Sequence, residues 1–244
     1  MKAAAMTDVG CRRENNEDRV FIDTSRGLLV LADGMGGQLA GEVASEQAVA
    51  TVASYVQNEW HDNGASGSGS IGELLIGCIG EANSAIYRRA TQDINLKGMG
   101  TTIVIAICHE GHVNIAHVGD SRAYLFRDGK LQQLTEDHSL VAEMVTAGEI
   151  TSHEARTHQL RSVLTRSLGN KQAVSPEIRA CSWSQDDLLL LCSDGLTGMV
   201  EDRDLEEILR RHAKDLERSC EELIRAAKAM GGIDNISVIV ARTD

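Results

Sequence analysis

Aromatic residues and positive charge are both scarce in this chain. Phe, Tyr and Trp make up only 3% of its 244 residues, so the core must be built from Val, Ile, Leu and Ala. The formal net charge is −12. A strongly negative protein repels nucleic-acid phosphates, and few aromatic side chains remain to stack on bases. We therefore expect no nucleic-acid partner.

The sequence also lacks long apolar runs and Cys-x-x-Cys pairs. The N-terminal stretch MKAAAMTDVG contains no apolar segment long enough for a signal peptide, and no other segment approaches a membrane span. Four of the six cysteines lie in apolar runs, as is typical of reduced core thiols in a cytosolic protein. We expect a cytoplasmic, monomeric protein that does not bind a membrane.

Short β-branched runs bounded by turn residues predict seven strands. They are Arg19–Ile22, Leu28–Ala32, Thr101–Cys108, Val113–Val118, Ala123–Phe126, Leu188–Cys192 and Ile236–Ala241. The stretches HEGH (109–112) and RDGK (127–130) are typical of hairpin turns. The turns predict that residues 101–134 form one antiparallel meander.

Apolar residues three and four positions apart predict helices over Val49–Trp60 and Ile71–Ile86. Two more are expected near Asp204–His212 and Leu216–Met230. The segment 61–70 reads as a flexible loop rather than a boundary, because similar elements lie on both sides. Paired helices and antiparallel strands favour an α+β layered fold, which we expect to form one domain over residues 1–244.

Acidic residues stand at the ends of the predicted strands. The runs LLVLADG and LLLLCSDG each end in Asp-Gly, at Asp33 and Asp194. Asp120 follows a third strand, Asp234 precedes a fourth, and the pair 17–18 (Glu-Asp) precedes a fifth. Each one alone could be a turn or a helix cap. Five such positions need another explanation, because buried carboxylates are costly unless they are paired or bind a metal.

The ends of neighbouring strands can meet at one rim of a sheet. Carboxylates gathered there would repel one another and raise each other's pKa values unless cations lie between them. A ligand set made of oxygen alone, without His or Cys, suits Mg²⁺ or Mn²⁺. The glycines after Asp33 and Asp194 would let backbone carbonyls approach an ion and would permit a sharp turn. The sequence thus predicts a divalent-metal site.

Six segments follow one another along the chain: GCRRENNED, VLADGMGGQLAGEVAS, GMGTTIVIA, HVGDSRAYLFRDGKLQQLTEDHSL, LLLCSDGLTGMV and GGIDNISVIV. Together they resemble the metal-dependent type 2C serine/threonine protein phosphatases in their bacterial form. The resemblance extends from about Met6 to Ala241. It implies a four-layer α/β/β/α sandwich, in which two packed antiparallel sheets are flanked by helices and the metal site lies at one end.

The resemblance implies a binuclear centre that holds Mn²⁺ or Mg²⁺. Asp33 would bridge the two ions, and the Gly34 carbonyl would bind one of them. Asp194 and Asp234 would hold the other ion. Asp18 would contribute through a bound water, with Glu17 as its less certain neighbour.

Two further roles follow from the resemblance. Asp120 and Asp194 would form a weaker, third metal site. Arg13 would be the arginine that binds phosphate, because a guanidinium can clamp two phosphate oxygens at once. Without the resemblance, Arg13 would be taken for an ordinary surface arginine.

The implied activity is hydrolysis of phosphoserine and phosphothreonine in proteins. Two ions about 3.5–4 Å apart lower the pKa of a shared water and neutralise charge on the phosphate, so the water can attack phosphorus in line. No covalent phosphoenzyme is needed. The implied partners are phosphorylated proteins, including a Ser/Thr kinase and its substrates.

The proton donor to the leaving group stays open. Many bacterial relatives carry histidine directly after DGMGG, where this chain has Gln38, and glutamine cannot supply a proton. The donor is then metal-bound water or another group. His138 in TEDHSL is one candidate, although a structural role is the simpler interpretation for a single histidine.

The segment 140–169 resembles the flap that lies beside the active site in this family. It carries Arg156, Arg161 and Arg166. These arginines either steer phosphopeptides or form a solvated helical face, since exposed charges usually contribute little.

Two other classes of protein can be recognised by their sequence motifs, and neither motif is present. No Cys is followed by Arg six residues later, which excludes a phosphatase with a cysteine nucleophile, and no Gly-x-x-x-x-Gly-Lys-Ser/Thr loop occurs. The alternative is a catalytically silent module that keeps the fold and binds phosphoproteins. Degenerate relatives lose metal-binding aspartates, and none is missing here. A nuclease or another two-metal phosphodiesterase is a more distant possibility.

Overall fold

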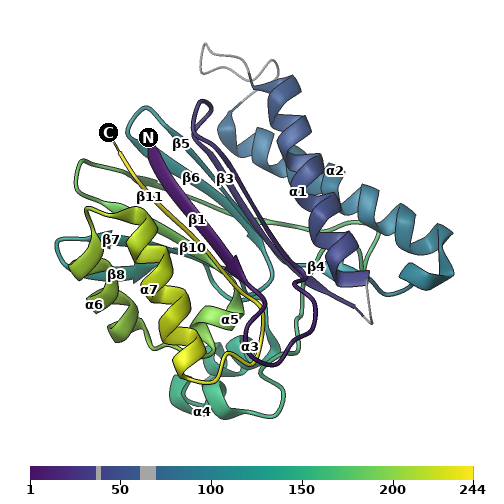
Figure 1. The fold of residues 1–244 in the computed structure, drawn as a ribbon. Coiled ribbons are helices and arrows are strands. Elements are labelled where there is room, and N and C mark those ends of the chain that lie inside the picture. The colour runs from purple at the N-terminus through teal and green to yellow at the C-terminus, as the bar shows by residue number, and fades with distance from the viewer. Residues whose placement is uncertain (37–39, 61–69, 244) are drawn as a thin grey trace.

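Two antiparallel sheets form the centre of the molecule in a computed structural model that describes residues 1–36, 40–60 and 70–243 (Figure 1). The first sheet has the strand order β1 (Lys2–Asp8), β11 (Ile236–Arg242), β10 (Leu188–Cys192), β7 (Arg122–Arg127) and β8 (Lys130–Gln133). The second has the order β2 (Asp18–Asp23), β3 (Leu28–Met35), β5 (Ile103–His109), β6 (His112–Val118) and β9 (Glu177–Ser182). The short strand β4 (Gly100–Thr101) pairs with the end of β3.

Helices cover the outer face of each sheet (Figure 1). One buried apolar cluster joins α1 (Ala40–Glu59) and α2 (Ile71–Gln92) to the sheet that contains β3. Another joins α6 (Asp202–His212) and α7 (Leu216–Ala229) to the sheet that contains β10. A third cluster fills the space between the sheets. The expected four-layer α/β/β/α sandwich is confirmed.

The central strands are apolar along their whole length because both of their faces are buried. In β3, Leu28 and Val30 pack toward the helices, whereas Leu29 and Leu31 pack toward the other sheet. The leucines of β10 alternate in the same way between the two layers. Continuous apolar runs of this kind are expected for strands covered on two sides.

The predicted helices are present, and their bounds differ slightly from the predictions. The first begins at Ala40, nine positions before the start of the predicted range, and α2 continues to Gln92. Ser70 caps α2, and Glu73 completes a capping box. Residues 61–69 of the predicted loop lie outside the described residues. A short 3₁₀ helix, η1 (Ile94–Leu96), follows α2.

The predicted meander over residues 101–134 is wrong. The hairpins at 109–112 and 127–130 both form, but β5 and β6 belong to one sheet and β7 and β8 to the other. The chain crosses between the sheets after Val118, at Gly119, whose φ is +111°. Apolar alternation is the same in both sheets, so periodicity does not reveal which sheet a strand joins.

Two of the observed strands, β1 and β9, were not predicted from the sequence. β1 is rich in alanine and pairs only with β11, which brings the two ends of the chain together (Figure 1). β9 is an edge strand with mostly exposed residues. Neither shows the continuous buried apolar run that marks the inner strands.

The segment between β8 and β9 carries α3 (Leu140–Thr146) and α4 (Ser152–Thr157) at the lower end of the sandwich in Figure 1. The short helix α5 (Asp194–Thr197) follows β10 at the same end. No helix within the described ranges is long and apolar enough to cross a membrane.

The packing of α2 gives a test of this architecture. Ile79 is fully buried between the helices and the sheet, whereas Ile76, one turn away, is 51% exposed. We expect Ile79→Ala to lower the free energy of unfolding by about 2–5 kcal/mol, because it removes buried methyl groups and leaves a cavity. Ile76→Ala should change it by less than about 0.5 kcal/mol. Urea unfolding measures both, and equal effects would contradict the assigned faces of the helix.

Candidate metal centre and active site

Five aspartates predicted as ligands gather at one end of the sandwich, where strands of both sheets end. Asp18 begins β2 and stands opposite Asp33 of β3 in the strand register. Asp194 begins α5, directly after β10, and Asp234 lies two residues before β11. Asp120 lies where the chain crosses from β6 to β7. The metal-site prediction thus named residues that the fold brings to one place.

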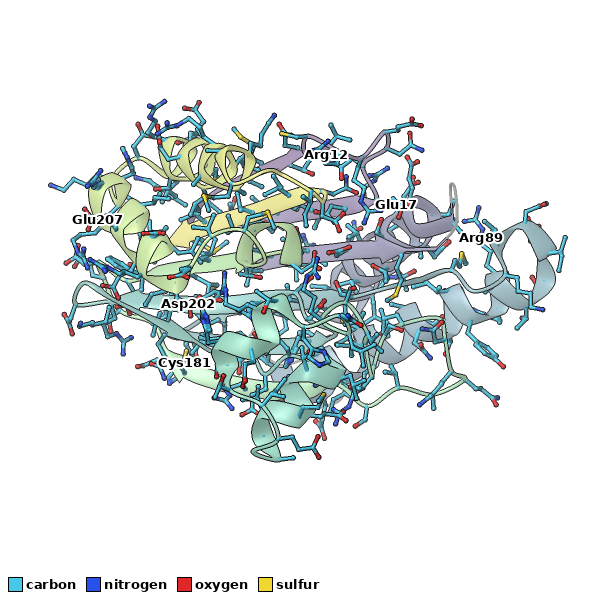
Figure 2. All side chains as sticks on the ribbon, turned by 90° about the horizontal axis from the view of Figure 1, so that it is seen from below. Arg12, Glu17, Arg89, Cys181, Asp202 and Glu207 are labelled. Carbon is cyan, nitrogen blue, oxygen red and sulfur yellow. The ribbon has the colours of Figure 1, made fainter. Side chains whose placement is uncertain are left out.

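Figure 2 views the molecule from this end. Glu17, in the loop between β1 and β2, lies in the upper right part of the view, with Arg12 above it and to its left. Arg89 of α2 and Glu207 of α6 lie toward opposite sides of the molecule. In this view the loop that leads into β2 therefore lies between the two helical layers.

The pKa values of the buried aspartates show how strongly they interact. Burial raises the pKa of Asp33 well above its usual range, and the carboxylates of Asp18 and Asp194 raise it further. Burial also raises the pKa of Asp18 to about 7 and that of Asp194 to about 6. The pKa of Asp120 rises through burial and the nearby charge of Asp194. Such mutual repulsion is what a cation between the carboxylates would relieve.

The donor set fits hard divalent cations. The Oδ1 atom of Asp18 is buried and has no hydrogen-bond partner among the described residues. The carboxyl groups of Asp33 and Asp194 are close enough to affect each other's pKa, so a cation placed between them would relieve their repulsion. An orphaned carboxylate oxygen beside other acidic oxygens is a suitable environment for Mg²⁺ or Mn²⁺.

The glycines after the aspartates allow two backbones to come close together. A Cβ atom on Gly34 would lie 2.2 Å from the Gly41 carbonyl oxygen, and one on Gly195 would lie 1.9 Å from the Asn235 carbonyl oxygen. Neither glycine has a positive φ. Neither position therefore needs glycine for a left-handed backbone, and the close packing of neighbouring segments is what requires glycine at both.

Arg13 lies at the mouth of the site. Its Nη2 donates to Asp234 Oδ2 at 2.8 Å, and its side chain is 52% exposed. Asp234 raises the pKa of Arg13, with partial burial opposing it. Its guanidinium thus stays charged next to the acidic group and is open to solvent, as a phosphate-binding arginine would have to be.

Asn235 holds the loop of Arg13 in place, and the sequence analysis missed it. Its Nδ2 donates to the carbonyls of Val9 (3.0 Å) and Asn15 (2.9 Å), and its Oδ1 accepts from the Glu17 N–H at 2.8 Å. This side chain is buried and satisfies three backbone groups of one loop. The only signal for it was its position directly after Asp234 in the segment GGIDN.

A cleft of about 1280 Å³ extends from three of the aspartates to the flap. Arg13, Asp120, Asp194 and Asp234 belong to its lining, and so do residues of α3, α4 and the following loop. The segment 140–169 therefore lies beside the metal site, as a flap would.

The three flap arginines line the cleft but differ in their contacts. Arg156 donates to the Thr197 carbonyl at the end of α5 (3.3 Å), and Arg166 lies 3.2 Å from His138 Nε2. Arg161 is exposed, and its guanidinium has no bond within the described part of the chain. Arg156 and Arg166 thus contribute to holding the flap, which leaves Arg161 available to a ligand.

His138 belongs to a buried cluster with His117 and Glu177. The two imidazole rings are stacked, with centroids 4.6 Å apart and planes 14° apart, so their in-plane lone pairs do not converge on one point. His138 Nδ1 accepts from the Gly119 N–H (3.2 Å), and Arg166 brings its positive charge to the other nitrogen. We interpret this cluster as a support for the flap rather than as a metal site.

Burial, together with the nearby His117 and Arg166, lowers the pKa of His138 to about 4. The ring is therefore neutral near pH 7, which agrees with the structural role expected for it. Gln38, which stands where many bacterial relatives carry a histidine, lies outside the described residues.

The raised pKa values predict how charge affects stability. A carboxyl group with a higher pKa in the folded protein stabilises the fold when protonated, and this stabilisation is lost as the pH rises through the folded-state pKa. In chelator at pH 7.5, Asp33→Asn should therefore be more stable than the wild type, because the amide carries no charge for the neighbouring carboxylates to repel. The gain should shrink toward pH 5.

Urea unfolding of both proteins at the two pH values measures this difference. The comparison between proteins cancels the buried histidines, whose lowered pKa values act in the opposite sense. A stability difference that does not change with pH would contradict the mutual repulsion of the aspartates.

Comparisons with known proteins agree with this geometry. The sequence profile described as Protein phosphatase 2C matches residues 11–231. The chain is 40% identical to "Serine/threonine phosphatase stp" of Listeria monocytogenes, over 100% of this chain and 96% of that protein.

Solved structures show the same likeness. The serine/threonine phosphatase PstP/Ppp of Mycobacterium tuberculosis superposes with a TM-score of 0.90 at 37% identity, covering 100% of this chain and 98% of that one. A PstP catalytic domain in complex with two manganese ions gives 0.86 at 36% identity, covering 98% and 96%. The cofactor prediction of Mn²⁺ or Mg²⁺ agrees with those ions, and the predicted family is confirmed. The chain belongs to the protein phosphatase 2C family.

Proposed function

We propose that this protein hydrolyses phosphoserine and phosphothreonine in other proteins, with two Mg²⁺ or Mn²⁺ ions as cofactor. The observation that carries the proposal is the group of buried and half-buried aspartates at one end of the sandwich, beside one exposed arginine that lines a cleft. The aspartates supply several oxygen ligands for metal ions in one place, and the guanidinium of Arg13 supplies a positive charge that can bind the phosphate. All the residues that the family resemblance requires for this are present.

The ligand assignment follows the positions of the aspartates. Asp33 lies between the others, since its pKa responds to four neighbouring carboxylates, and it is the residue that would bridge two ions. Gly34 is next along β3 and would offer its carbonyl to one ion. Asp194 and Asp234 would hold the second ion.

The remaining carboxylates lie around this pair of ions. Asp18 would contribute through a bound water, on the side of its unpaired Oδ1. Asp120 interacts with Asp194, which supports a third, weaker site between these two residues. When bound, the ions supply charge neutralisation and an activated water for in-line attack on phosphorus.

The chain's own contribution is to bind and orient the phosphoryl group. Arg13 can clamp two phosphate oxygens from the solvent side, because its Nη2 donates to Asp234 and the rest of its guanidinium is accessible. His138 does not donate the proton to the leaving group, since it is neutral near pH 7 and hydrogen-bonded within the flap support.

The cleft between the site and the flap is where a phosphorylated protein segment would lie. Arg161 is the flap arginine best placed to meet it, because its guanidinium is exposed and uncommitted among the described residues. We propose phosphorylated proteins as partners, among them a Ser/Thr kinase and its substrates. We further propose that residues 1–244 act as one domain, monomeric and cytoplasmic.

Loss of a metal ligand tests the proposed activity. We expect Mn²⁺-dependent hydrolysis of a phosphothreonine peptide and of p-nitrophenyl phosphate, and no hydrolysis in excess EDTA. Asp194→Asn should lower kcat/KM at least about 100-fold, which is about 2.7 kcal/mol of barrier. Asp202→Asn is the control, since this residue lines the same cleft but bonds to the Tyr124 hydroxyl instead (3.2 Å).

Full activity in EDTA, or an Asp194→Asn variant that keeps more than a tenth of the wild-type rate, would contradict the metal assignment. Tight binding of the phosphopeptide by the wild type without any hydrolysis would favour the catalytically silent module instead.

Arg13 is tested against its neighbour. Arg13→Lys keeps the charge but loses the two-pronged contact with phosphate, so we expect kcat/KM to fall about 10–100-fold, equivalent to about 1.4–2.7 kcal/mol. Arg12→Lys changes the exposed arginine beside it (Figure 2) and should have little effect. Steady-state kinetics on the phosphopeptide measure both. Equal losses in the two variants, or no loss in Arg13→Lys, would contradict a specific two-pronged contact between Arg13 and the phosphate.

A further inference from the structure

The carboxylate of Asp18 has two unlike oxygens. Oδ2 accepts a hydrogen bond from the Ser193 hydroxyl at 2.9 Å, whereas Oδ1 is buried without a partner among the described residues. The residue as a whole is only 1% exposed. One oxygen is thus held by the protein, and the other is left for the metal centre.

The Ser193 hydroxyl has little freedom to do anything else. It is fully buried, and its oxygen accepts the Ser237 N–H at 3.0 Å. Its oxygen lies closer to Asp18 Oδ2 (2.9 Å) than to the Asn235 carbonyl oxygen (3.5 Å). A hydroxyl has one proton to give, so this one is directed at Asp18.

Ser237 is a second hydroxyl near Asp18. Both serines lower the pKa of Asp18, Ser237 more than Ser193, but the Ser237 hydroxyl donates to Thr7 Oγ1 at 2.7 Å. The Asp18 backbone N–H is occupied separately by Asn16 Oδ1 at 3.0 Å. Within the described ranges, Ser193 is the side chain whose hydroxyl donates to the Asp18 carboxylate at hydrogen-bond distance.

Ser193 also connects the two sheets at the site. It follows β10 in one sheet, whereas Asp18 begins β2 in the other. The next residue after Ser193 is Asp194, the first residue of α5 (Figure 1). This turn of the chain thus places Asp194 in the proposed metal centre. It also places the Ser193 hydroxyl against Asp18, which belongs to the opposite sheet.

We propose that Ser193 is a positioning residue for the metal centre, which fixes the Asp18 carboxylate so that Oδ1 faces the ion. This inference rests on the metal-site role of Asp18 proposed above. Groups that orient metal ligands typically change metal affinity about 10–100-fold when they are removed. The effect belongs to metal binding and precedes any reaction with substrate.

Manganese binding measured without substrate tests this role. The free-ion signal in electron paramagnetic resonance follows Mn²⁺ titrated into chelator-stripped protein. We expect Ser193→Ala to weaken at least one binding step about 10–100-fold. Ser219→Ala is the matched control, because this serine is equally buried but its hydroxyl bonds to the His212 and Asp215 carbonyls, next to α7. It should bind Mn²⁺ as the wild type does.

The outcomes separate this inference from the proposed function. A wild type that does not bind Mn²⁺ overturns the metal site itself. A wild type that binds, with Ser193→Ala within about twofold of it, overturns only the role of Ser193, and so does equal weakening in Ser219→Ala. If Ser193→Ala does not fold by circular dichroism, Ser193→Cys is compared with Ser219→Cys, since a thiol keeps the side-chain shape but donates weakly. Equal affinities in that pair would likewise overturn the role.

Discussion

Electrostatic repulsion among buried carboxylates is the constraint around which one end of this molecule is built. Asp18, Asp33, Asp120 and Asp194 all have raised pKa values, with burial as the largest cause and neighbouring carboxylates adding to it. A fold does not keep such an arrangement for stability alone, because each buried charge without a partner is costly. The arrangement becomes favourable when divalent cations lie between the oxygens.

The sandwich explains how distant parts of the chain meet there. Strands of both sheets end at the same rim, and the chain changes sheet directly before Asp120. Gly34 and Gly195 let backbone segments approach more closely than any side chain would allow. Hydrogen bonds from Asn235 and Ser193 then fix the Arg13 loop and the Asp18 carboxylate. The positions of the metal ligands thus depend on close backbone packing and on hydrogen bonds from uncharged side chains.

Much of this could be predicted from the sequence, because inner strands buried on both faces leave continuous apolar runs that end in aspartate. The crossing near Gly119 could not, since apolar alternation is the same in either sheet. The alanine-rich β1 lacked a strand signal. Ser193 and Asn235 stood beside predicted ligands, but a serine or asparagine at a strand end is usually a turn or cap residue. Their importance comes from hydrogen bonds across the sheets, which no local pattern encodes.

The position of bound manganese tests the account most directly. Crystals grown with Mn²⁺ and measured at the manganese absorption edge would locate each ion by its anomalous scattering. The account predicts two strong peaks on either side of the Asp33 carboxylate, within reach of Asp194, Asp234 and the Gly34 carbonyl. Peaks at the His117–His138–Glu177 cluster in place of these, or no peak near Asp33, would contradict it.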